Sequence, residues 1–313
     1  MQNERPPIKE TIRRYRWNFE GRSIPMGVGC AWVSAVENGE DGAEILLKSY
    51  QAGFRYYDTS RRYGESELVV GRFLREIDRK TIFLATKGGF NFKDPGGFEQ
   101  FKRDFYESFT RLGVEYIDLY QIHDTENYEH CVPEIIPFLR ERQKEGLIGY
   151  IGLGTRSLAA HCQGVACGDL ESSLSYMDYT LVKLSAQPLI ELARQKGTAF
   201  INASVLLFGL LKSPDPLNFR QKPAYGPELL HRGFVKEMQE LCRSLGIDIV
   251  AAALQFSLLN PDIDMTLNGL RRMSNLESTI GAMRARIEPE HWAAITELQR
   301  THPTIGIPDE RNF

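Results

Sequence analysis

The sequence lacks the cysteine pattern of a disulfide-bonded or zinc-binding protein. Its five cysteines are scattered, and no two of them form a CxxC pair. The longest apolar stretches, such as residues 250–254, are far too short to span a bilayer. The first ten residues are charged and proline-rich, without the apolar run of a signal peptide. We therefore expect reduced thiols and a cytoplasmic protein.

An excess of basic residues is also missing. The chain has 38 Lys and Arg against 41 Asp and Glu, a formal net charge of −3, which disfavours nucleic acid as the main partner. No linker-like or low-complexity stretch divides the 313 residues. Since α/β barrels of this length commonly form one unit, we expect a single domain over residues 1–313.

What the sequence does contain is a repeated alternation of strand and helix. Short β-branched or aromatic runs predict eight strands, at residues 26–31, 55–59, 81–87, 116–123, 150–153, 173–176, 199–203 and 265–267. Amphipathic segments predict helices between and after them, at residues 42–53, 66–77, 98–112, 133–144, 158–167, 188–196, 234–245, 249–259, 275–283 and 289–300. Such alternation is typical of a parallel sheet with crossover helices.

The number of repeats favours a (β/α)8 TIM barrel over an open doubly wound sheet. No GxGxxG follows the first strand, which weakens the Rossmann alternative. Residues 11–25 predict an N-terminal β-hairpin that turns at Glu20 and Gly21, and 289–300 is an extra C-terminal helix. Residues 212–226 contain three prolines and predict a long loop, which in a barrel commonly serves function.

Polar residues stand at the ends of three consecutive predicted strands. Asp58 ends the second, with Tyr63 in the loop beyond it, Lys87 ends the third and His123 the fourth. Each alone has an ordinary explanation, as a helix cap, a packing residue or a solvated charge. Because catalytic groups of barrels lie at the carboxyl ends of strands, we expect the four to converge at the barrel mouth.

Three segments resemble the motifs of the aldo-keto reductase superfamily. They are YYDTSRRYGESELVVG at 56–71, LATK at 84–87 and LYQIH at 119–123, and the likeness extends over residues 24–283. The resemblance implies an NAD(P)-dependent oxidoreductase that interconverts a carbonyl and an alcohol by hydride transfer. It assigns Tyr63 as general acid/base, Lys87 as the cation that lowers the pKa of Tyr63, Asp58 as the partner of Lys87, and His123 as a hydrogen-bond donor to the substrate oxygen.

The same resemblance implies where the nicotinamide dinucleotide binds. The implied cofactor contacts are Gly29, Asp58, Thr155, Tyr176, Ser204, Leu206, Gly209, Arg271, Arg272, Asn275 and Thr279. The chain departs from the usual pattern at Gly154, where a serine is common, and at Ala203, where an aromatic residue stacks on the nicotinamide. The loop 268–279 reads the adenosine end. Its two arginines form a plausible clamp for a 2′-phosphate and slightly favour NADP(H), with NAD(H) or dual use as the close alternative.

Residues in the loops after the strands predict the substrate pocket. The candidates are Trp32, Tyr63, Phe90, His123, Asp124 and Arg156, with Phe92, Arg61, Arg62 and Tyr225 nearby. Their mixture of aromatic and charged groups suits a small polar or sugar-like substrate. The segments SLSYMDY at 173–179 and INASVLLFGLL at 201–211 are also similar to sugar dehydrogenases of the galactose/fucose type and to pyridoxal dehydrogenases of the superfamily. We expect no nucleic-acid partner, no membrane and no metal, and a homo-oligomer remains open.

Two other functions are compatible with a strand-end lysine in a barrel. Lys87 could form a Schiff base with a carbonyl substrate, as in aldolases and lyases. Alternatively, the barrel could bind a nicotinamide nucleotide as a regulatory sensor without useful turnover. The presence of Tyr63 and Asp58 beside Lys87 favours the reductase over both.

Overall fold

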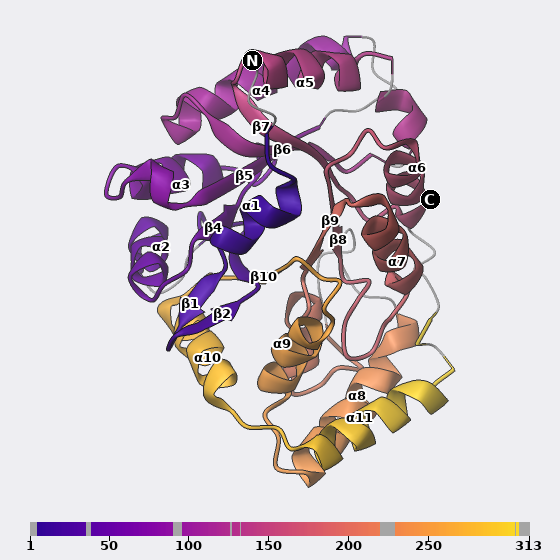
Figure 1. Ribbon diagram of the computed structural model, residues 1–313. Coiled ribbons are helices and arrows are strands. Elements are labelled where there is room, and N and C mark those ends of the chain that lie inside the picture. Colours follow the sequence, from indigo (N-terminus) through magenta and orange to yellow (C-terminus); the bar gives the residue numbers. More distant parts are fainter. Residues whose placement is uncertain are drawn as a thin grey trace.

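The computed structural model contains a closed barrel of eight parallel strands, in the order β10-β3-β4-β5-β6-β7-β8-β9 (Figure 1). This confirms the predicted (β/α)8 fold. The structure describes residues 5–35, 39–89, 96–125, 127–131, 133–219, 229–303 and 305–306. The barrel strands are β3 (Met26–Gly29), β4 (Tyr56–Asp58), β5 (Phe83–Gly88), β6 (Ile117–His123), β7 (Ile148–Gly154), β8 (Ser172–Tyr176), β9 (Ala199–Ala203) and β10 (Met265–Gly269).

Helices surround the barrel, and most of them begin and end close to the predicted residues. They are α2 (Gly42–Gln51), α3 (Ser66–Leu74), α4 (Gly97–Leu112), α5 (Ile135–Lys144), α6 (Leu158–Cys167), α7 (Gln187–Lys196), α8 (Leu229–Ser244), α9 (Ile249–Leu259), α10 (Met273–Arg284) and α11 (Pro289–Thr301), with short 3-10 turns η1 (Arg79–Thr81), η2 (Tyr128–Cys131) and η3 (Leu207–Lys212). Helix α8 begins five residues earlier than predicted, directly after residues outside the described part.

One prediction about the N-terminal segment is wrong in part. The hairpin turns at Glu20 and Gly21, which have φ values of 51° and 79°, but its strands are only β1 (Trp17–Phe19) and β2 (Arg22–Ile24). Residues expected to begin the hairpin belong instead to helix α1 (Ile8–Arg14). The apolar side chains Ile8 and Ile12 stand four residues apart on one face of this helix and are both buried.

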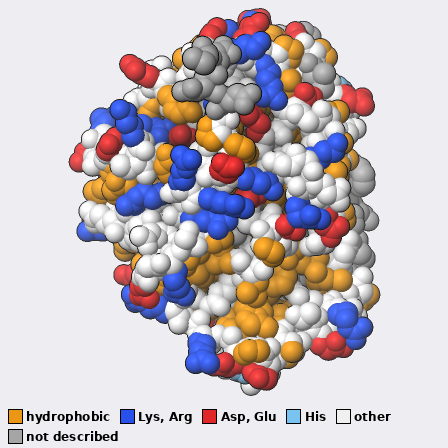
Figure 2. Space-filling model, in the orientation of Figure 1, with side chains coloured by type: hydrophobic (Ala, Val, Ile, Leu, Met, Phe, Trp, Pro, Cys, Tyr) orange, Lys and Arg blue, Asp and Glu red, His pale blue; other side chains and the backbone are white. Residues whose placement is uncertain are grey.

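Helix α1 closes the end of the barrel at which the strands begin (Figure 1). Ile8 and Ile12 pack against Tyr56 and Phe83 at the starts of β4 and β5. Thr11 Oγ1 lies 2.7 Å from the hydroxyl of Tyr150 on β7. Figure 2 shows this face closed over the barrel axis, with basic side chains gathered across its middle. Access to the interior is therefore from the opposite, carboxyl end.

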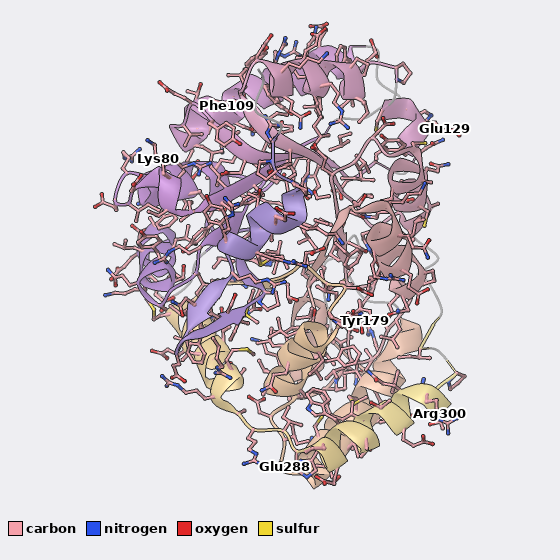
Figure 3. The ribbon with its side chains drawn as sticks, viewed as in Figure 1. Lys80, Phe109, Glu129, Tyr179, Glu288 and Arg300 are labelled. Atoms are coloured by element: carbon pink, nitrogen blue, oxygen red, sulfur yellow. The ribbon has the colours of Figure 1, made fainter. Side chains whose placement is uncertain are left out.

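The interior of the barrel is filled by side chains (Figure 3). Because side chains alternate along a strand, Tyr56, Phe83, Ala85 and Leu119 point inward, whereas Tyr57, Leu84 and Tyr120 pack outward against the helices. The inward row becomes polar only near the carboxyl end. The fold thus presents an apolar base beneath a polar mouth.

Among the described residues, no single helix is long and apolar enough to cross a membrane; α8 and α9 reach that length and hydropathy only as a pair bent by 104°.

Candidate active site

Strand alternation brings the predicted polar residues to the inner side of the barrel mouth. On β5, Phe83 and Ala85 point inward, and so therefore does Lys87. On β6 the same alternation from Leu119 places Gln121 and His123 inward. Asp58, Lys87, Gln121 and His123 are all at least 97% buried, with exposed fractions of 3%, 1%, 0% and 3%. Three of the four predicted catalytic residues thus share one buried cluster.

A buried ion pair lies at the centre of this cluster. Lys87 Nζ contacts Asp58 Oδ1 and also donates to the carbonyl of Thr59 at 2.8 Å. The second carboxylate oxygen of Asp58 accepts from Gln121 Nε2 at 2.9 Å. Burial raises the pKa of Asp58, while the charge of Lys87 acts in the opposite direction. Each charge is therefore compensated by the other and by further hydrogen bonds.

Strand β7 makes room for the lysine by carrying glycines on its inner face. A Cβ at Gly154 would lie 2.8 Å from Lys87 Cδ, and one at Gly152 would first meet Ser172 Oγ and lie 3.1 Å from Gln121 Cγ. Contacts below 3.0 Å require the neighbouring atoms to move. A larger side chain at Gly154 would therefore require the Lys87 side chain to shift.

Tyr63 lies in the loop after β4, above this ion pair. The ammonium of Lys87 is 5.0 Å from the centre of the Tyr63 ring. The ring of Tyr63 meets the imidazole of His123 edge to face, with centroids 5.4 Å apart and an interplanar angle of 87°. Unlike the other three, Tyr63 is only half-buried, so it faces the open mouth. The four predicted catalytic side chains therefore converge at one place.

His123 is held in an environment that disfavours its charged form. Burial lowers its pKa from 6.5 to about 3, and the Asp124 carboxylate only partly opposes this. Its Nδ1 atom lies 2.7 Å from Ser60 Oγ, and its Nε2 atom lies 3.6 Å from Asp124 Oδ2. The imidazole is consequently neutral near pH 7.

The rim of the mouth carries a second polar group, centred on Asp124. This residue has a left-handed backbone with φ of 51°, and its carboxylate accepts from the Tyr176 hydroxyl at 3.1 Å. Arg62 Nη1 is 3.6 Å from the other carboxylate oxygen. The Arg156 guanidinium lies 5.9 Å from the centre of the Tyr176 ring. The predicted substrate residues Asp124 and Arg156 thus belong to one network of charges and hydroxyls next to His123.

The segment after β9 has an unusual backbone. Ser204, Leu207 and Phe208 have φ values of 57°, 51° and 53°, and Gly209 has 97°. Leu206, at φ −90° and ψ 8°, is right-handed and is followed by the left-handed Leu207. Within this turn the Leu207 N–H donates to the Ser204 carbonyl at 2.8 Å, and the Gly209 N–H donates to the Leu206 carbonyl at 2.9 Å. The left-handed residues thus form a tight, internally bonded turn after β9, at the predicted cofactor positions.

Other predicted cofactor residues are engaged within the protein. The Thr155 hydroxyl, which is buried, donates to the carbonyl of Thr125 at 2.8 Å. Gly29 pairs with Asp58 on one side and Gly269 on the other. Trp32 is 41% exposed and meets Phe208 edge to face across the mouth, with centroids 6.3 Å apart. Phe90, together with Phe92 and Tyr225, lies outside the described residues.

The loop after β10 is also internally bonded. Asn275 Oδ1 accepts from the backbone N–H groups of Arg271 and Arg272, each at 3.1 Å, and so closes the start of α10. Thr279 Oγ1 accepts from Asn268 Nδ2 at 2.7 Å. The Arg271 side chain donates from Nε to the Ala35 carbonyl at 2.9 Å and lies over the Trp32 ring.

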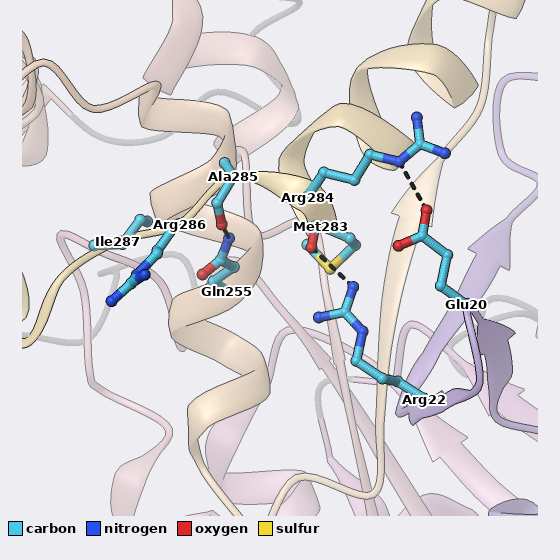
Figure 4. Close-up of a pocket in the computed structure, with 8 residues that line it drawn as sticks. All are labelled: Glu20, Arg22, Gln255, Met283, Arg284, Ala285, Arg286 and Ile287. Atoms are coloured by element: carbon cyan, nitrogen blue, oxygen red, sulfur yellow. Dashed lines mark hydrogen bonds and ion pairs between the residues drawn. The ribbon is translucent and has the colours of Figure 1, made fainter.

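A separate surface pocket of about 510 Å³ lies at the other end of the barrel (Figure 4). It is formed by the turn of the N-terminal hairpin and the end of α10. Its charged groups are already paired, since Arg284 Nε is 2.9 Å from Glu20 Oε1 and Arg22 donates to the Met283 carbonyl at 3.1 Å. This pocket is therefore unrelated to the buried cluster at the mouth.

Three residues of this region were not predicted from the sequence. Gln121 and Ser60 bond directly to Asp58 and His123. Glu40 accepts from the Met273 N–H with both carboxylate oxygens, at 3.3 and 3.1 Å. Strict alternation back from His123 would have identified Gln121. No local signal marks Ser60 or Glu40, because their partners are distant in the sequence.

The fold and site define a closed (β/α)8 barrel with a buried cluster of charged and polar side chains at its carboxyl end. The model of the aldo/keto reductase family matches residues 25–300, so the chain belongs to this family and is an oxidoreductase. It is 31% identical to an L-galactose dehydrogenase of Arabidopsis thaliana over 282 residues, covering 87% of this chain and 82% of that protein.

Two further comparisons agree. A D-threo-aldose 1-dehydrogenase of a Pseudomonas species is 27% identical over 316 residues, covering 89% of this chain and 95% of that protein. An aldo-keto reductase of Bacillus halodurans, solved in its holo form, superposes with a TM-score of 0.71 at 22% identity, covering 95% of this chain and 98% of that one. The latter likeness concerns the fold alone.

The buried position of His123 predicts a specific pH behaviour. With a pKa of about 3, its ring signals should show no titration step between pH 8 and pH 5 in a ¹⁵N-histidine NMR titration. Burial also lowers the pKa of His161 to about 4, so its ring should likewise show no titration step in this range. In the unfolded chain both rings take up a proton near pH 6.5. As the pH falls from there toward the pKa of the folded state, each histidine therefore lowers the free energy of unfolding by about 1.4 kcal/mol per pH unit. A midpoint for His123 above pH 6 would contradict this description of the site.

Proposed function

We propose that this protein transfers hydride between a nicotinamide nucleotide and a small polar, sugar-like molecule, interconverting a carbonyl and an alcohol. The observation that carries the proposal is the convergence of Asp58, Lys87, Tyr63 and His123 at the open end of the barrel. The small residues Gly29 and Ala203, at the ends of β3 and β9, are compatible with an extended dinucleotide across this mouth.

The chain's own residues account for the proton chemistry. The bound nucleotide supplies the hydride to the carbonyl carbon, or accepts it from the alcohol carbon. In reduction, Tyr63 donates its hydroxyl proton to the carbonyl oxygen, and the adjacent Lys87 charge stabilises the resulting phenolate. Neutral His123 donates a hydrogen bond to the same oxygen and orients it. In oxidation, the Tyr63 phenolate takes the proton back.

The rim of the mouth supports a hydroxyl-rich substrate. Asp124, Arg62 and Arg156 offer one carboxylate and two guanidinium groups close to His123, and Tyr176 holds Asp124 in place. Charged hydrogen-bonding groups of this kind match a polyhydroxylated molecule better than an apolar one. The names of two relatives, L-galactose dehydrogenase and D-threo-aldose 1-dehydrogenase, point to the same class of substrate.

The geometry of Lys87 disfavours the Schiff-base alternative. Its ammonium is 1% exposed and bonded to the Asp58 carboxylate and the Thr59 carbonyl. A Schiff base requires a neutral amine that a carbonyl carbon can reach. The buried carboxylate stabilises the charged form instead, and the Lys87 side chain is surrounded by protein atoms.

The substitution Tyr63→Phe tests the proposed reaction. The expected loss of turnover would also exclude a barrel that only binds nucleotide as a regulator. It removes the proton donor and keeps the ring, so kcat should fall by about 10²- to 10⁴-fold while nucleotide affinity changes little. Nucleotide binding is measured by fluorescence titration and turnover with a panel of aldoses and their alcohols. Tyr50→Phe, which removes a hydroxyl bonded to Thr81 far from the mouth, is the matched control. Unchanged turnover in Tyr63→Phe would refute the mechanism.

For the nucleotide, the contacts of Glu40 favour NAD(H) over the slight preference for NADP(H) drawn from the two arginines. The loop 268–279 that the family resemblance assigns to the adenosine end includes the start of α10. There the Glu40 carboxylate accepts a hydrogen bond from the Met273 N–H, which belongs to the first turn of α10 and has no acceptor within that helix. A ribose 2′-hydroxyl can donate to this carboxylate, whereas a 2′-phosphate would be repelled by it.

The substitution Glu40→Gln tests this preference. The wild-type protein should bind NADH more tightly than NADPH, and Glu40→Gln should lower the Kd for NADPH by about tenfold with little change for NADH, because one repulsive charge is removed. Glu44→Gln removes the same charge from the exposed side of α2 and should leave both Kd values unchanged. A wild-type preference for NADPH would overturn the assignment of Glu40.

A further inference from the structure

The hydroxyl of Ser60, directly after β4 and Thr59, lies among three hydrogen-bonding groups. Ser60 Oγ is 2.7 Å from His123 Nδ1 and 3.0 Å from the Lys87 carbonyl, and it accepts from the Arg62 N–H at 3.1 Å. Ser60 is completely buried. Its single proton can therefore be donated either to His123 or to Lys87, and the choice determines where the proton of the neutral imidazole resides.

The Lys87 carbonyl does not need the Ser60 proton. It already accepts a hydrogen bond from the Arg61 N–H at 3.0 Å. The Nδ1 atom of His123, at 2.7 Å, is the nearer partner of the two. The shorter distance therefore favours donation from Ser60 to Nδ1.

The other side of the imidazole gives an independent argument. His123 Nε2 is 3.6 Å from Asp124 Oδ2. If Ser60 donated to Lys87, the ring proton would be on Nδ1, and the Nε2 lone pair would face a carboxylate. With the proton on Nε2, an N–H faces that carboxylate instead, which is electrostatically favourable.

A comparable arrangement occurs elsewhere in the chain, at His161. His161 Nε2 is 3.0 Å from the Thr155 carbonyl, which can only accept, so this nitrogen carries the proton. Its Nδ1 is 2.7 Å from Ser173 Oγ, which must then be the donor. A buried serine that fixes a histidine through Nδ1 is thus already present in this protein.

We propose that Ser60 is a positioning residue that donates its proton to His123 Nδ1 and thereby holds the imidazole in the tautomer with its proton on Nε2. Since the neutral ring has one N–H only, this tautomer decides whether His123 donates to the substrate oxygen or merely accepts. The consequence for catalysis rests on the proposed function, whereas the tautomer itself is a property of the protein without substrate.

NMR spectroscopy of protein labelled with ¹⁵N-histidine tests the tautomer directly. Long-range ¹H–¹⁵N correlations should show His123 and His161 with the same pattern, protonated at Nε2 and not at Nδ1. Ser60→Ala should change the Nδ1 and Nε2 signals of His123 toward the other tautomer or a mixture and leave His161 unchanged. Ser173→Ala should do the reverse. A wild-type His123 protonated at Nδ1 would overturn the proposal, whether or not Ser60→Ala folds.

Kinetics then separate positioning from a structural role. Ser60→Ala should lower kcat by about tenfold to a hundredfold with little change in KM, since a preorganised donor to the reacting oxygen is lost. Ser49→Ala removes another completely buried serine hydroxyl, bonded to Leu46 and Tyr57, and should leave kcat unchanged. If Ser60→Ala lost activity while His123 kept its Nε2 proton, the proposal would be wrong. If the wild type turned over no substrate but the spectra were as expected, only the proposed function would fail.

Discussion

The rest of the site depends on the buried ion pair between Lys87 and Asp58. Removing an ammonium and a carboxylate from water costs several kcal/mol each, and only close pairing with additional hydrogen bonds offsets this. The chain supplies such bonds from Gln121 and the Thr59 carbonyl. It also leaves β7 without side chains at Gly152 and Gly154, where the stems of Gln121 and Lys87 pass. An apolar barrel base below and a half-buried Tyr63 above hold the pair away from solvent.

This constraint explains the charge states around it. One positive charge is already present beside the tyrosine, and burial keeps His123 neutral, so the ring contributes a hydrogen bond and not a second cation. The charges of the substrate rim, Asp124 and Arg62, stay further out, where solvent partly screens them. In the proposed mechanism, proton transfer by Tyr63 beside the buried pair is therefore separate from substrate recognition at the rim. Ser60 connects the two levels through the orientation of His123.

The sequence predicted the barrel and the converging tetrad because both depend on local patterns. Alternation along β5 and β6 is enough to place Lys87 and His123 inward, and β9 and α9 were predicted to the residue. Predictions were weaker where distant residues meet. The bonds from Arg271 to the Ala35 carbonyl and from Met273 to Glu40 span more than 230 residues, and no local pattern marks them. The sequence did not predict helix α1, because the helix is stabilised by the packing of Ile8 and Ile12 against the barrel base and not by a local pattern.

In the proposed mechanism the Lys87 charge stabilises the Tyr63 phenolate, in addition to its structural pairing with Asp58. The most direct measurement compares the single-turnover rate of hydride transfer, using nucleotide deuterated at C4, in the wild type and in the double variant Asp58→Asn/Lys87→Met. The double variant removes both buried charges together, so it should retain its fold, and the rate is measured at saturating nucleotide so that a change in affinity does not affect it. We predict that its hydride-transfer rate falls by about a hundredfold or more, because Tyr63 loses its cation. A folded double variant with a rate close to that of the wild type would contradict the account.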